Sequence, residues 1–558
     1  MRRRVLKSGI GLSVVLTGCG IVWACSSDPN APNPGGMAGS GPSTGGTTGT
    51  GGTPSTTAGT GTTTAGTGMT TAGTSPTAGT GGAGTAGTVG AGGTTGGGSA
   101  GGAGGGTGGG GGITPPACKA TTGVNGAGIT VNATDISAFK YVPPVTGSPM
   151  TKMAYDPVGH VVVILQQNGT LTAFDPMVAL PTTAATATVT TTMPYNSGYQ
   201  GNGDHRGIVF DKDGNLYVMA ANNGGVTIKK GAVAAGGGAR TWTNLVTTSV
   251  GYQNGASANY NHSFSGIAVS ADGKFLYFSS GSRTEHGEDE GPSGVAGNNR
   301  EVPLTSCVLK VPTDTPTDLK NEDAALAPFL FADGTRNAFD MAFNADGDLI
   351  GTENGPDMDL PDEINWLQQG KHYGFPWRFG DVDNPVTVQG FTKEGDKRIR
   401  QVYGGYNTYA FDGAFPAKPA NVTFTDPIQN MGPEANFLVA SKDAAAPTKA
   451  GAEGLAGVTA HRSPLGIAFD TAGALCGEYY KQGFVLSYGP IPGGSIGDTG
   501  EDLLLISLTK NGDKYSMTTK QLAKGIKAPM DSVLVGNRLF TIGYGGTAQV
   551  YVFALPTP

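Results

Sequence analysis

Charged residues are scarce in this chain, and one long stretch has none. Of 558 residues only 14% are Asp, Glu, Lys or Arg, and residues 29–118 include none of them. The stretch consists mainly of Gly, Thr, Ala, Ser and Pro, and residues 31–112 hold 35 of the 96 glycines. Because it lacks large apolar side chains, burial cannot offset the entropy lost on folding, and we expect a disordered tether. Its glycines follow no three-residue period with abundant proline, which excludes a collagen helix.

A basic surplus is also missing, and this excludes a class of partner. The formal net charge is −7, and residues 119–558 contain 31 basic and 41 acidic residues. Such an acidic domain repels phosphate backbones, so we expect no nucleic-acid binding. Those roughly 440 residues suffice for one large folded domain.

Cysteine and histidine are too few and too scattered for a metal site built from their side chains. The five cysteines include no C-x-x-C pair, and none of the six histidines lies in an H-E-x-x-H pattern. Three cysteines fall near or within the folded domain, namely Cys118, Cys307 and Cys476. In an oxidising compartment two of them can pair and leave one free, but the sequence does not say which.

The N-terminus has the features of an export signal. Arg2, Arg3, Arg4 and Lys7 form a basic segment, and residues 8–24 form an apolar run that ends in small residues and cysteine. The segment Leu16–Cys19 resembles a bacterial lipobox, whose cysteine is lipidated and becomes the mature N-terminus. Cys25 is the alternative, because the polar residues 26–28 follow it directly. An ordinary signal peptide and an uncleaved anchor are the other readings.

These features divide the chain into three parts. We expect residues 1–25 to be a lipoprotein signal peptide, residues 26–118 a low-complexity disordered tether, and residues 119–558 a single folded domain. The tether then holds the domain near a membrane surface, in the periplasm or at the cell surface.

Six units of the folded domain share one pattern, in which two short apolar runs flank a turn containing glycine. In the clearest copy, Gly207–Phe210 and Leu216–Val218 flank Asp213-Gly214. Asp-Gly supplies the positive-φ positions of a tight hairpin, and the flanks are β-prone. The six turn glycines are Gly159, Gly214, Gly273, Gly347, Gly473 and Gly536. Their spacing predicts an all-β, six-bladed β-propeller, although the long interval between Gly347 and Gly473 has room for a seventh blade or for insertions.

Two histidines precede hairpins in a way that suits a propeller. His262 lies shortly before Gly266, and His205 lies just before Gly207. Loops that feed inner strands surround the central channel, where propellers place functional side chains. The alternative for either residue is an ordinary loop histidine that is hydrogen-bonded to backbone.

Acidic residues gather in two runs. Residues 353–365 contain five carboxylates, and the turn at Gly355-Pro356 could present main-chain carbonyls, so the run suits Ca²⁺. A solvated acidic loop is the alternative for this run. Residues 285–290 lack such turn constraints, and we expect them to form a solvated loop.

The order of these motifs resembles the soluble quinoprotein glucose/sorbosone dehydrogenase family. The resemblance lies in His262 with its spacing to Asp272-Gly273, Arg336-Asn337, Gly355-Pro356, Asp362-Glu363-Ile364-Asn365 and Tyr373-Gly374-Phe375-Pro376. It covers most of the chain after Tyr141. Members of this family are six-bladed propellers that bind pyrroloquinoline quinone (PQQ) and Ca²⁺ at the channel mouth and oxidise sugars or related alcohols.

The resemblance implies a role for each matching residue. His262 matches the catalytic base, and Arg336 and Asn337 match the pair that contacts the quinone. The carbonyls of Gly355 and Pro356 match the ligands of the cofactor-bound Ca²⁺. His262 would take the hydroxyl proton while hydride passes to the quinone, and Arg336 would stabilise the charge that develops.

Other parts of the family pattern are matched less closely. Asn202 takes about the place of a quinone-binding Gln. Arg462 and Lys481 are the candidates for basic partners of the quinone carboxylates. Ala338 stands where many members have proline after the Arg-Asn pair.

The implied partners are a sugar or polyol substrate and an external electron acceptor, either a cytochrome or a membrane quinone. A membrane tether would keep such an acceptor within reach. Two functions of other classes remain as alternatives. One is a non-catalytic surface propeller that binds polysaccharide or protein, and the other is a Ca²⁺-dependent lactonase, in which the Arg336-Asn337 pair has no role.

Overall fold

The computed structural model describes residues 114–558 with several internal gaps. The gaps are 143–144, 146, 185–188, 190, 196, 223–224, 234–238, 249–261, 290–299, 490–495, 497–499 and 546–548. Cys19, Cys25 and the predicted tether up to residue 113 lie outside the described residues. None of the helices in the described part is long and apolar enough to span a membrane.

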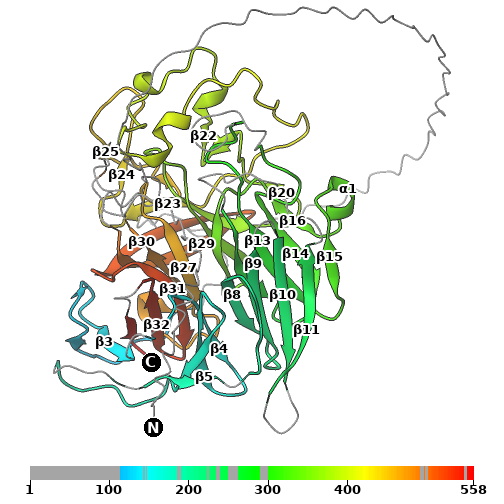
Figure 1. Ribbon diagram of the computed structural model, residues 1–558. Coiled ribbons are helices and arrows are strands. Elements are labelled where there is room, and N and C mark those ends of the chain that lie inside the picture. Colours follow the sequence, from blue (N-terminus) through cyan, green and yellow to red (C-terminus); the bar gives the residue numbers. More distant parts are fainter. Residues whose placement is uncertain are drawn as a thin grey trace, which may run out of the picture. The chain divides into compact units, whose positions relative to one another are not determined.

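The described residues form a β-propeller, in which each sheet runs outward from an inner strand (Figure 1). The first sheet contains β4 (Met150–Asp156), β5 (Val161–Gln166), β6 (Leu171–Phe174) and β7 (Met193–Pro194). The second contains β8 (Asp204–Phe210), β9 (Leu216–Asn222), β10 (Gly225–Ala232), β11 (Thr241–Thr248) and β15 (Thr317–Leu319). The third contains β12 (Phe264–Val269), β13 (Phe275–Ser280), β14 (Cys307–Pro312), β16 (Leu330–Asp333) and β20 (Lys371–His372).

The remaining sheets follow in chain order and return to the N-terminal strands. The next sheet contains β17 (Ala338–Phe343), β18 (Leu349–Glu353) and β19 (Glu363–Leu367). After it come β27 (Pro464–Phe469), β28 (Gly483–Ser487), β29 (Asp502–Asn511) and β30 (Lys514–Lys524), joined by β23 (Gln429–Pro433), β26 (Leu455–Ala456) and β2 (Thr130–Val131). The last sheet contains β31 (Pro529–Val535), β32 (Arg538–Gly543), β33 (Val550–Ala554), β3 (Ser137–Val142) and β1 (Asn125–Gly126).

Short elements connect these sheets. They are α1 (Asp323–Leu326), η1 (Pro385–Thr387), η2 (Lys393–Gly395), η3 (Gly404–Thr408), η4 (Gly477–Tyr479), β21 (Arg378–Phe379), β22 (Val382–Asp383), β24 (Leu438–Val439) and β25 (Thr448–Lys449). The described residues between Gly347 and Gly473 do not form a separate four-stranded sheet that could serve as a seventh blade. Their strands β23 and β26 join the β27–β30 sheet instead. That interval therefore holds insertions.

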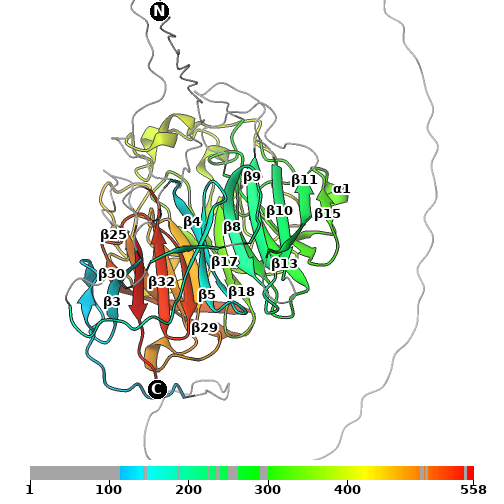
Figure 2. The same cartoon turned by 60° about the horizontal axis from the view of Figure 1, so that its bottom comes forward.

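Counting within the described ranges, five sheets have four or more strands and the β17–β19 sheet has three. Strand β17 packs between β12 and β27, in line with the inner strands of the larger sheets. In Figure 2 the labelled strands β4, β8 and β17 lie near the middle of the propeller. Strand β3 pairs antiparallel with β33, with Ser137 opposite Ala554. The two ends of the folded domain therefore share one sheet, which closes the ring.

All six predicted hairpins are present. The φ angle is positive at five of the six turn glycines, for example 80° at Gly214. In the first hairpin the positive φ, 54°, falls on His160 and not on Gly159. Gly159 is suited to this turn for another reason, because a Cβ there would lie 2.8 Å from Oδ2 of Asp156.

A disulfide joins Cys118 to Cys476 and leaves Cys307 free and buried. Beside it, the Gly477 amide donates to the Pro116 carbonyl at 3.0 Å. The last residues of the predicted tether are therefore attached to the β27–β28 connection.

The core lies mainly between neighbouring sheets, and an ion-paired group crosses the channel inside them. Lys152 Nζ on β4 lies 3.1 Å from Asp340 on β17 and 3.4 Å from Asp531 on β31. Strand β4 packs against β8 and β31, whereas β17 packs against β12 and β27, so the Lys152–Asp340 pair spans the channel. All three side chains are nearly inaccessible, and they line a cavity of about 270 Å³.

This ion-paired group gives a stability prediction. Replacing Lys152→Met leaves two buried carboxylates without their cation, and we expect a loss of about 3–5 kcal/mol in the free energy of unfolding, measured by urea denaturation. The matched control is Lys520→Met, which removes a half-exposed pair with Glu478 and should leave stability almost unchanged. Adding Asp340→Asn and Asp531→Asn to Lys152→Met should recover much of the loss. Wild-type stability of Lys152→Met alone would contradict this account.

Candidate active site

Main-chain hydrogen bonds gather three predicted site residues at one end of the sheets. The His262 amide donates to Ser282 O at 2.8 Å, and the Ser282 amide donates to Arg336 O at 2.8 Å. The Asn354 amide donates to Asn337 O at 3.2 Å. His262 directly precedes the inner strand β12, and Arg336 and Asn337 directly precede β17. Their loops therefore lie at the end of the sheets opposite to the hairpin turns.

His262 has the features of a proton acceptor. Its side chain is buried, and its Nε2 has no hydrogen-bond partner among the described residues. Burial, together with the positive charges of Arg336 and Arg206, holds the pKa of His262 well below its usual value of 6.5. The imidazole is therefore neutral at pH 7, with an unpaired nitrogen at this end of the channel.

His205 matches the alternative interpretation from the sequence, a histidine that is hydrogen-bonded within the protein. Its Nδ1 lies 3.0 Å from Gln167 O, and its Nε2 lies 2.9 Å from the Tyr199 hydroxyl. Both ring nitrogens are thus engaged inside the protein. His205 is a structural histidine on strand β8, although its place in the sequence is similar to that of His262.

Arg336 is buried and is held by a network that the sequence did not reveal. Its Nη2 donates to a carboxylate oxygen of Glu285, and its Nε donates to Glu285 O at 2.8 Å. Its Nη1 donates to Asn354 O at 3.0 Å and to Gly355 O at 2.7 Å. Glu285 is fully buried, and burial raises its pKa to about 7 against the opposing effect of the Arg336 charge.

The expectation of a solvated loop is therefore wrong for residues 285–288, whereas Glu290 lies outside the described residues. Glu285 and His286 are both inaccessible, and Glu288 is nearly so. The reason is charge neutralisation, because the buried Arg336 guanidinium needs a carboxylate nearby. The loop is held by the Glu288 carboxylate, which accepts the Glu285 amide at 3.0 Å and the His286 amide at 2.8 Å.

The second acidic run is also buried, which excludes its reading as a solvated loop. Glu353 lies opposite Glu363 across strands β18 and β19, and Nδ2 of Asn365 donates to both carboxylates, at 3.1 and 2.9 Å. Burial and the Glu363 charge raise the pKa of Glu353 well above its usual range. Glu353 also accepts the Arg336 amide, so this run supports the same site.

Asn354 is a candidate ligand contact that sequence reasoning missed. Its side chain is 1% exposed, and neither its Oδ1 nor its Nδ2 has a partner among the described residues. Buried amides are rarely left unpaired, so this one suits a ligand that both donates and accepts hydrogen bonds. The Asn354 amide and Nε2 of His262 are thus two buried polar groups at this end of the sheets that have no partner among the described residues.

Calcium fits the predicted carbonyl pair less well. Gly355 O accepts from the Arg336 guanidinium at 2.7 Å, and Pro356 O accepts from the Met358 amide at 2.6 Å. Across the described ranges no group of three or more His, Cys, Asp or Glu side chains could hold a metal ion. A divalent cation at Gly355 O would have to displace a guanidinium, so this donor set, as arranged, does not fit Ca²⁺.

Of the three other candidates, only Lys481 lies at the opposite end of the sheets from this cluster. Asn202 is exposed on the segment before β8. Lys481 lies in the β27–β28 connection, whereas Arg462 lies just before β27, at the other end of that strand. Arg462 is fully buried and is ion-paired with Asp502.

The protein is an all-β propeller with a candidate ligand site at one end of its channel. That end holds a neutral histidine whose Nε2 has no partner among the described residues, and a buried arginine. Residues 152–405 match the family described as Glucose / Sorbosone dehydrogenase, and this segment contains His262, Arg336, Asn337 and Asn354. The match confirms the resemblance seen in the sequence, and it shows that this segment, a little under half of the chain, is similar to that family. No curated protein matches the chain.

Solved structures with a similar chain path include three sugar dehydrogenases. The soluble aldose sugar dehydrogenase of Escherichia coli, in its apo form, is 14% identical and covers 75% of this chain and 99% of its own, with a TM-score of 0.43. The PQQ-bound aldose sugar dehydrogenase of Streptomyces coelicolor is 16% identical over 75% and 97%, with a TM-score of 0.43. The holo PQQ domain of pyranose dehydrogenase from Coprinopsis cinerea is 14% identical over 77% and 100%, with a TM-score of 0.47. At these values the likeness adds nothing to the assignment, which depends on the family match and the strand order.

The unpaired amide of Asn354 can be tested through stability. Replacing Asn354→Leu removes a buried side-chain amide that makes no hydrogen bond to any described residue, so the free energy of unfolding should stay equal or rise. The matched control is Asn384→Leu, because Nδ2 of the buried Asn384 donates to His286 O and to Pro376 O, each at 2.7 Å. We expect that control to lose about 1–3 kcal/mol or more in urea denaturation. Equal losses in both variants would show that Asn354 is structural.

Proposed function

We propose that this protein is an exported, PQQ-dependent dehydrogenase that oxidises an aldose sugar or a related alcohol. The observation that carries the proposal is the buried Nε2 of His262, which has no hydrogen-bond partner among the described residues and is subject to the positive charge of Arg336. Both residues fall inside the segment that matches the glucose/sorbosone dehydrogenase family. PQQ, when bound, would supply the two-electron acceptor for the hydride of the alcohol carbon.

His262 would act as the general base. Its neutral ring can accept the hydroxyl proton of the substrate at Nε2, and its burial keeps water from competing for that nitrogen. The nearby charges of Arg336 and Arg206 disfavour the imidazolium, so the base stays unprotonated through the physiological range. The same charges favour release of the proton to solvent after it is taken.

Arg336 would orient the site and stabilise negative charge. Its position is fixed by Glu285 on one side and by the carbonyls of Asn354 and Gly355 on the other. A guanidinium held in this way needs no reorganisation when charge develops nearby. The roles of Asn337 and Asn202 as cofactor contacts stay predictions, and Asn354 is a further contact supported by its unpaired amide.

Calcium is the part of the family pattern that these residues support least. The carbonyls of Gly355 and Pro356 already accept hydrogen bonds, so we assign no step to the ion. The proposed base and the proposed charge stabiliser are both side chains of the protein itself.

We further propose that the propeller has six blades, with the three-stranded β17–β19 sheet as the fourth. Its inner strand packs between β12 and β27, and its hairpin has the same Asp-Gly turn as the two preceding blades. The reduced cofactor must pass its electrons to an external acceptor, a cytochrome or a membrane quinone. The Cys118–Cys476 disulfide supports export to an oxidising compartment.

Dye-linked sugar oxidation tests the enzyme proposal. With PQQ present, the full chain should reduce an artificial electron acceptor when aldoses or polyols are added, and His262→Gln should lower kcat by about 10²–10⁴-fold. The control is His160→Gln, which changes an exposed histidine at the β4–β5 turn. Because the pKa of His262 is lowered, the neutral base persists and its contribution should not decline between about pH 8 and pH 6, but only as the pH falls further.

Two results would overturn the proposal. If no sugar or polyol supports dye reduction and no quinone absorbance remains after desalting, the chain is a binding propeller and not a dehydrogenase. Hydrolysis of lactones without quinone would instead indicate a lactonase. Full activity of His262→Gln would reject only the assignment of the base.

The membrane anchor is tested by labelling with a fatty-acid analogue. We propose that Cys19 is lipidated and that the tether links it to the domain, with Cys25 as the alternative. Cys19→Ser should abolish labelling and release the protein from membranes, whereas Cys25→Ser should leave both unchanged. The reverse pattern would assign Cys25, and labelling of neither cysteine would reject the anchor.

A further inference from the structure

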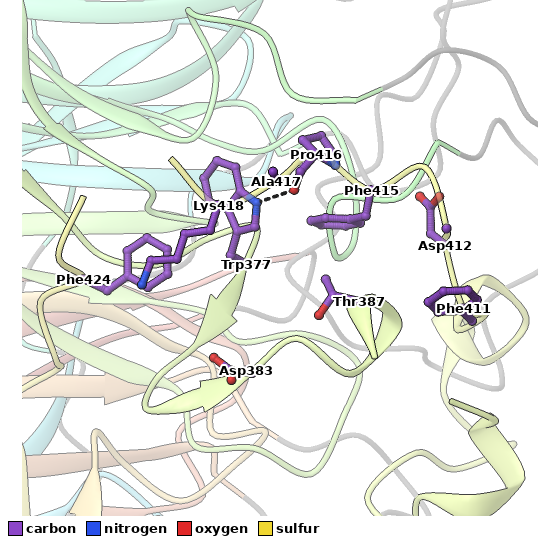
Figure 3. Close-up of a pocket in the computed structure, with 11 residues that line it drawn as sticks. Trp377, Asp383, Thr387, Phe411, Asp412, Phe415, Pro416, Ala417, Lys418 and Phe424 are labelled. Carbon is purple, nitrogen blue, oxygen red and sulfur yellow. Dashed lines mark hydrogen bonds between the residues drawn. The ribbon is translucent and has the colours of Figure 1, made fainter. Parts of the chain in front are cut away.

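A second hollow lies away from His262, on the loops that follow β20. It has a volume of about 390 Å³, and four aromatic side chains line it, Trp377, Phe411, Phe415 and Phe424 (Figure 3). The carboxylates of Asp383 and Asp412, with Thr387 and Lys418, complete its wall. None of the sequence motifs that led to the candidate active site includes this group of residues.

The loop at residues 285–288 separates this pocket from Arg336. On one side of the loop, Glu285 is ion-paired with Arg336. On the other side, a Cβ added at Gly287 would lie 2.7 Å from the Phe415 ring, so the loop packs directly against the pocket wall. The pocket and the candidate active site are thus distinct, although they share one supporting loop.

Hydrogen bonds and ring contacts fix the pocket walls. Trp377 Nε1 donates to Pro416 O at 2.7 Å, and the Trp377 and Phe424 rings are nearly parallel, with centroids 6.2 Å apart. Asp412 accepts the Ala414 amide at 2.9 Å and is ion-paired with Arg300 at 2.8 Å. A ligand would therefore meet a surface that is already ordered, which lowers the entropy cost of binding.

The charges around the pocket argue against an ionic ligand. Lys418 lies 4.0 Å and Arg378 5.3 Å from the centre of the Phe424 ring, and Arg300 lies 5.6 Å from that of Phe415. These protein cations repel a further cation at the same rings. Counting Arg300, which is ion-paired with Asp412, the pocket has two basic side chains for its two carboxylates, so no surplus of either sign attracts an ion.

A neutral ligand with apolar faces and several hydroxyl groups suits this lining. Sugar rings have C–H groups that pack on aromatic rings and hydroxyls that donate to carboxylates such as Asp383. We propose that the pocket is a second carbohydrate site, which binds a pyranose ring of a neutral saccharide without oxidising it. This inference goes beyond the proposed dehydrogenase function and does not depend on it.

Binding without any redox readout tests the inference. The full chain, without added PQQ, is run in native gels containing neutral polysaccharides such as glucans, mannans and xylans, and soluble oligosaccharides are titrated by calorimetry. We expect retardation by at least one polymer. Phe411→Ala and Asp383→Asn should each weaken binding by about tenfold or more, since they remove a ring face and a hydroxyl acceptor.

A matched variant controls for general loss of exposed apolar surface. Phe411 is 43% exposed, and Phe275 on β13 is 37% exposed outside the pocket, so Phe275→Ala should bind as the wild type does. All three variants should keep the wild-type thermal midpoint, because the changed side chains are exposed. The proposal would be overturned if no polymer retarded the protein, or if Phe411→Ala and Asp383→Asn bound as tightly as the wild type. Dye reduction measured on the same samples reports the dehydrogenase separately, so failure of one proposal is distinguishable from failure of the other.

Discussion

The buried ion pair between Arg336 and Glu285 is the interaction on which the candidate site depends. A guanidinium that is 1% exposed would be strongly destabilising without a partner, and Glu285 supplies one from a loop distant in sequence. The pairing draws residues 285–288 inward, and the other Arg336 donors hold the carbonyls of Asn354 and Gly355. One charge therefore fixes three loops around His262, and its field also keeps that imidazole neutral.

The same pair shapes what lies on either side of it. Toward the channel, His262 Nε2 and the Asn354 amide are buried without a hydrogen-bond partner among the described residues, which is costly unless a ligand binds them. Away from the channel the loop supports Phe415 and closes one wall of the aromatic pocket. The loop that carries Glu285 thus contacts the candidate site on one side and the wall of the aromatic pocket on the other.

Local patterns predicted much of the fold, because hairpins are decided by residues close together in the chain. Turn glycines such as Gly214 located the hairpins, and the order of motifs from His262 to Phe375 identified the family. Pairings across the fold were not predictable in this way. Nothing near Glu285 indicates that it faces Arg336, and the choice of Cys476 over Cys307 as the partner of Cys118 depends on which loops meet in space. His205 and His262 make the same point, since only their tertiary partners distinguish a structural ring from an available base.

The point at which the chain enters the propeller bears on how the site can be used. Pro116 and Cys118 attach to the β27–β28 connection, whereas Arg462 and the loops around His262 lie where the inner strands begin. The chain from the predicted tether therefore joins the end of the sheets opposite to the candidate site. The described entry point of the chain, at residues 116–118, is thus separated from the loops around His262 by the length of the β27–β28 hairpin.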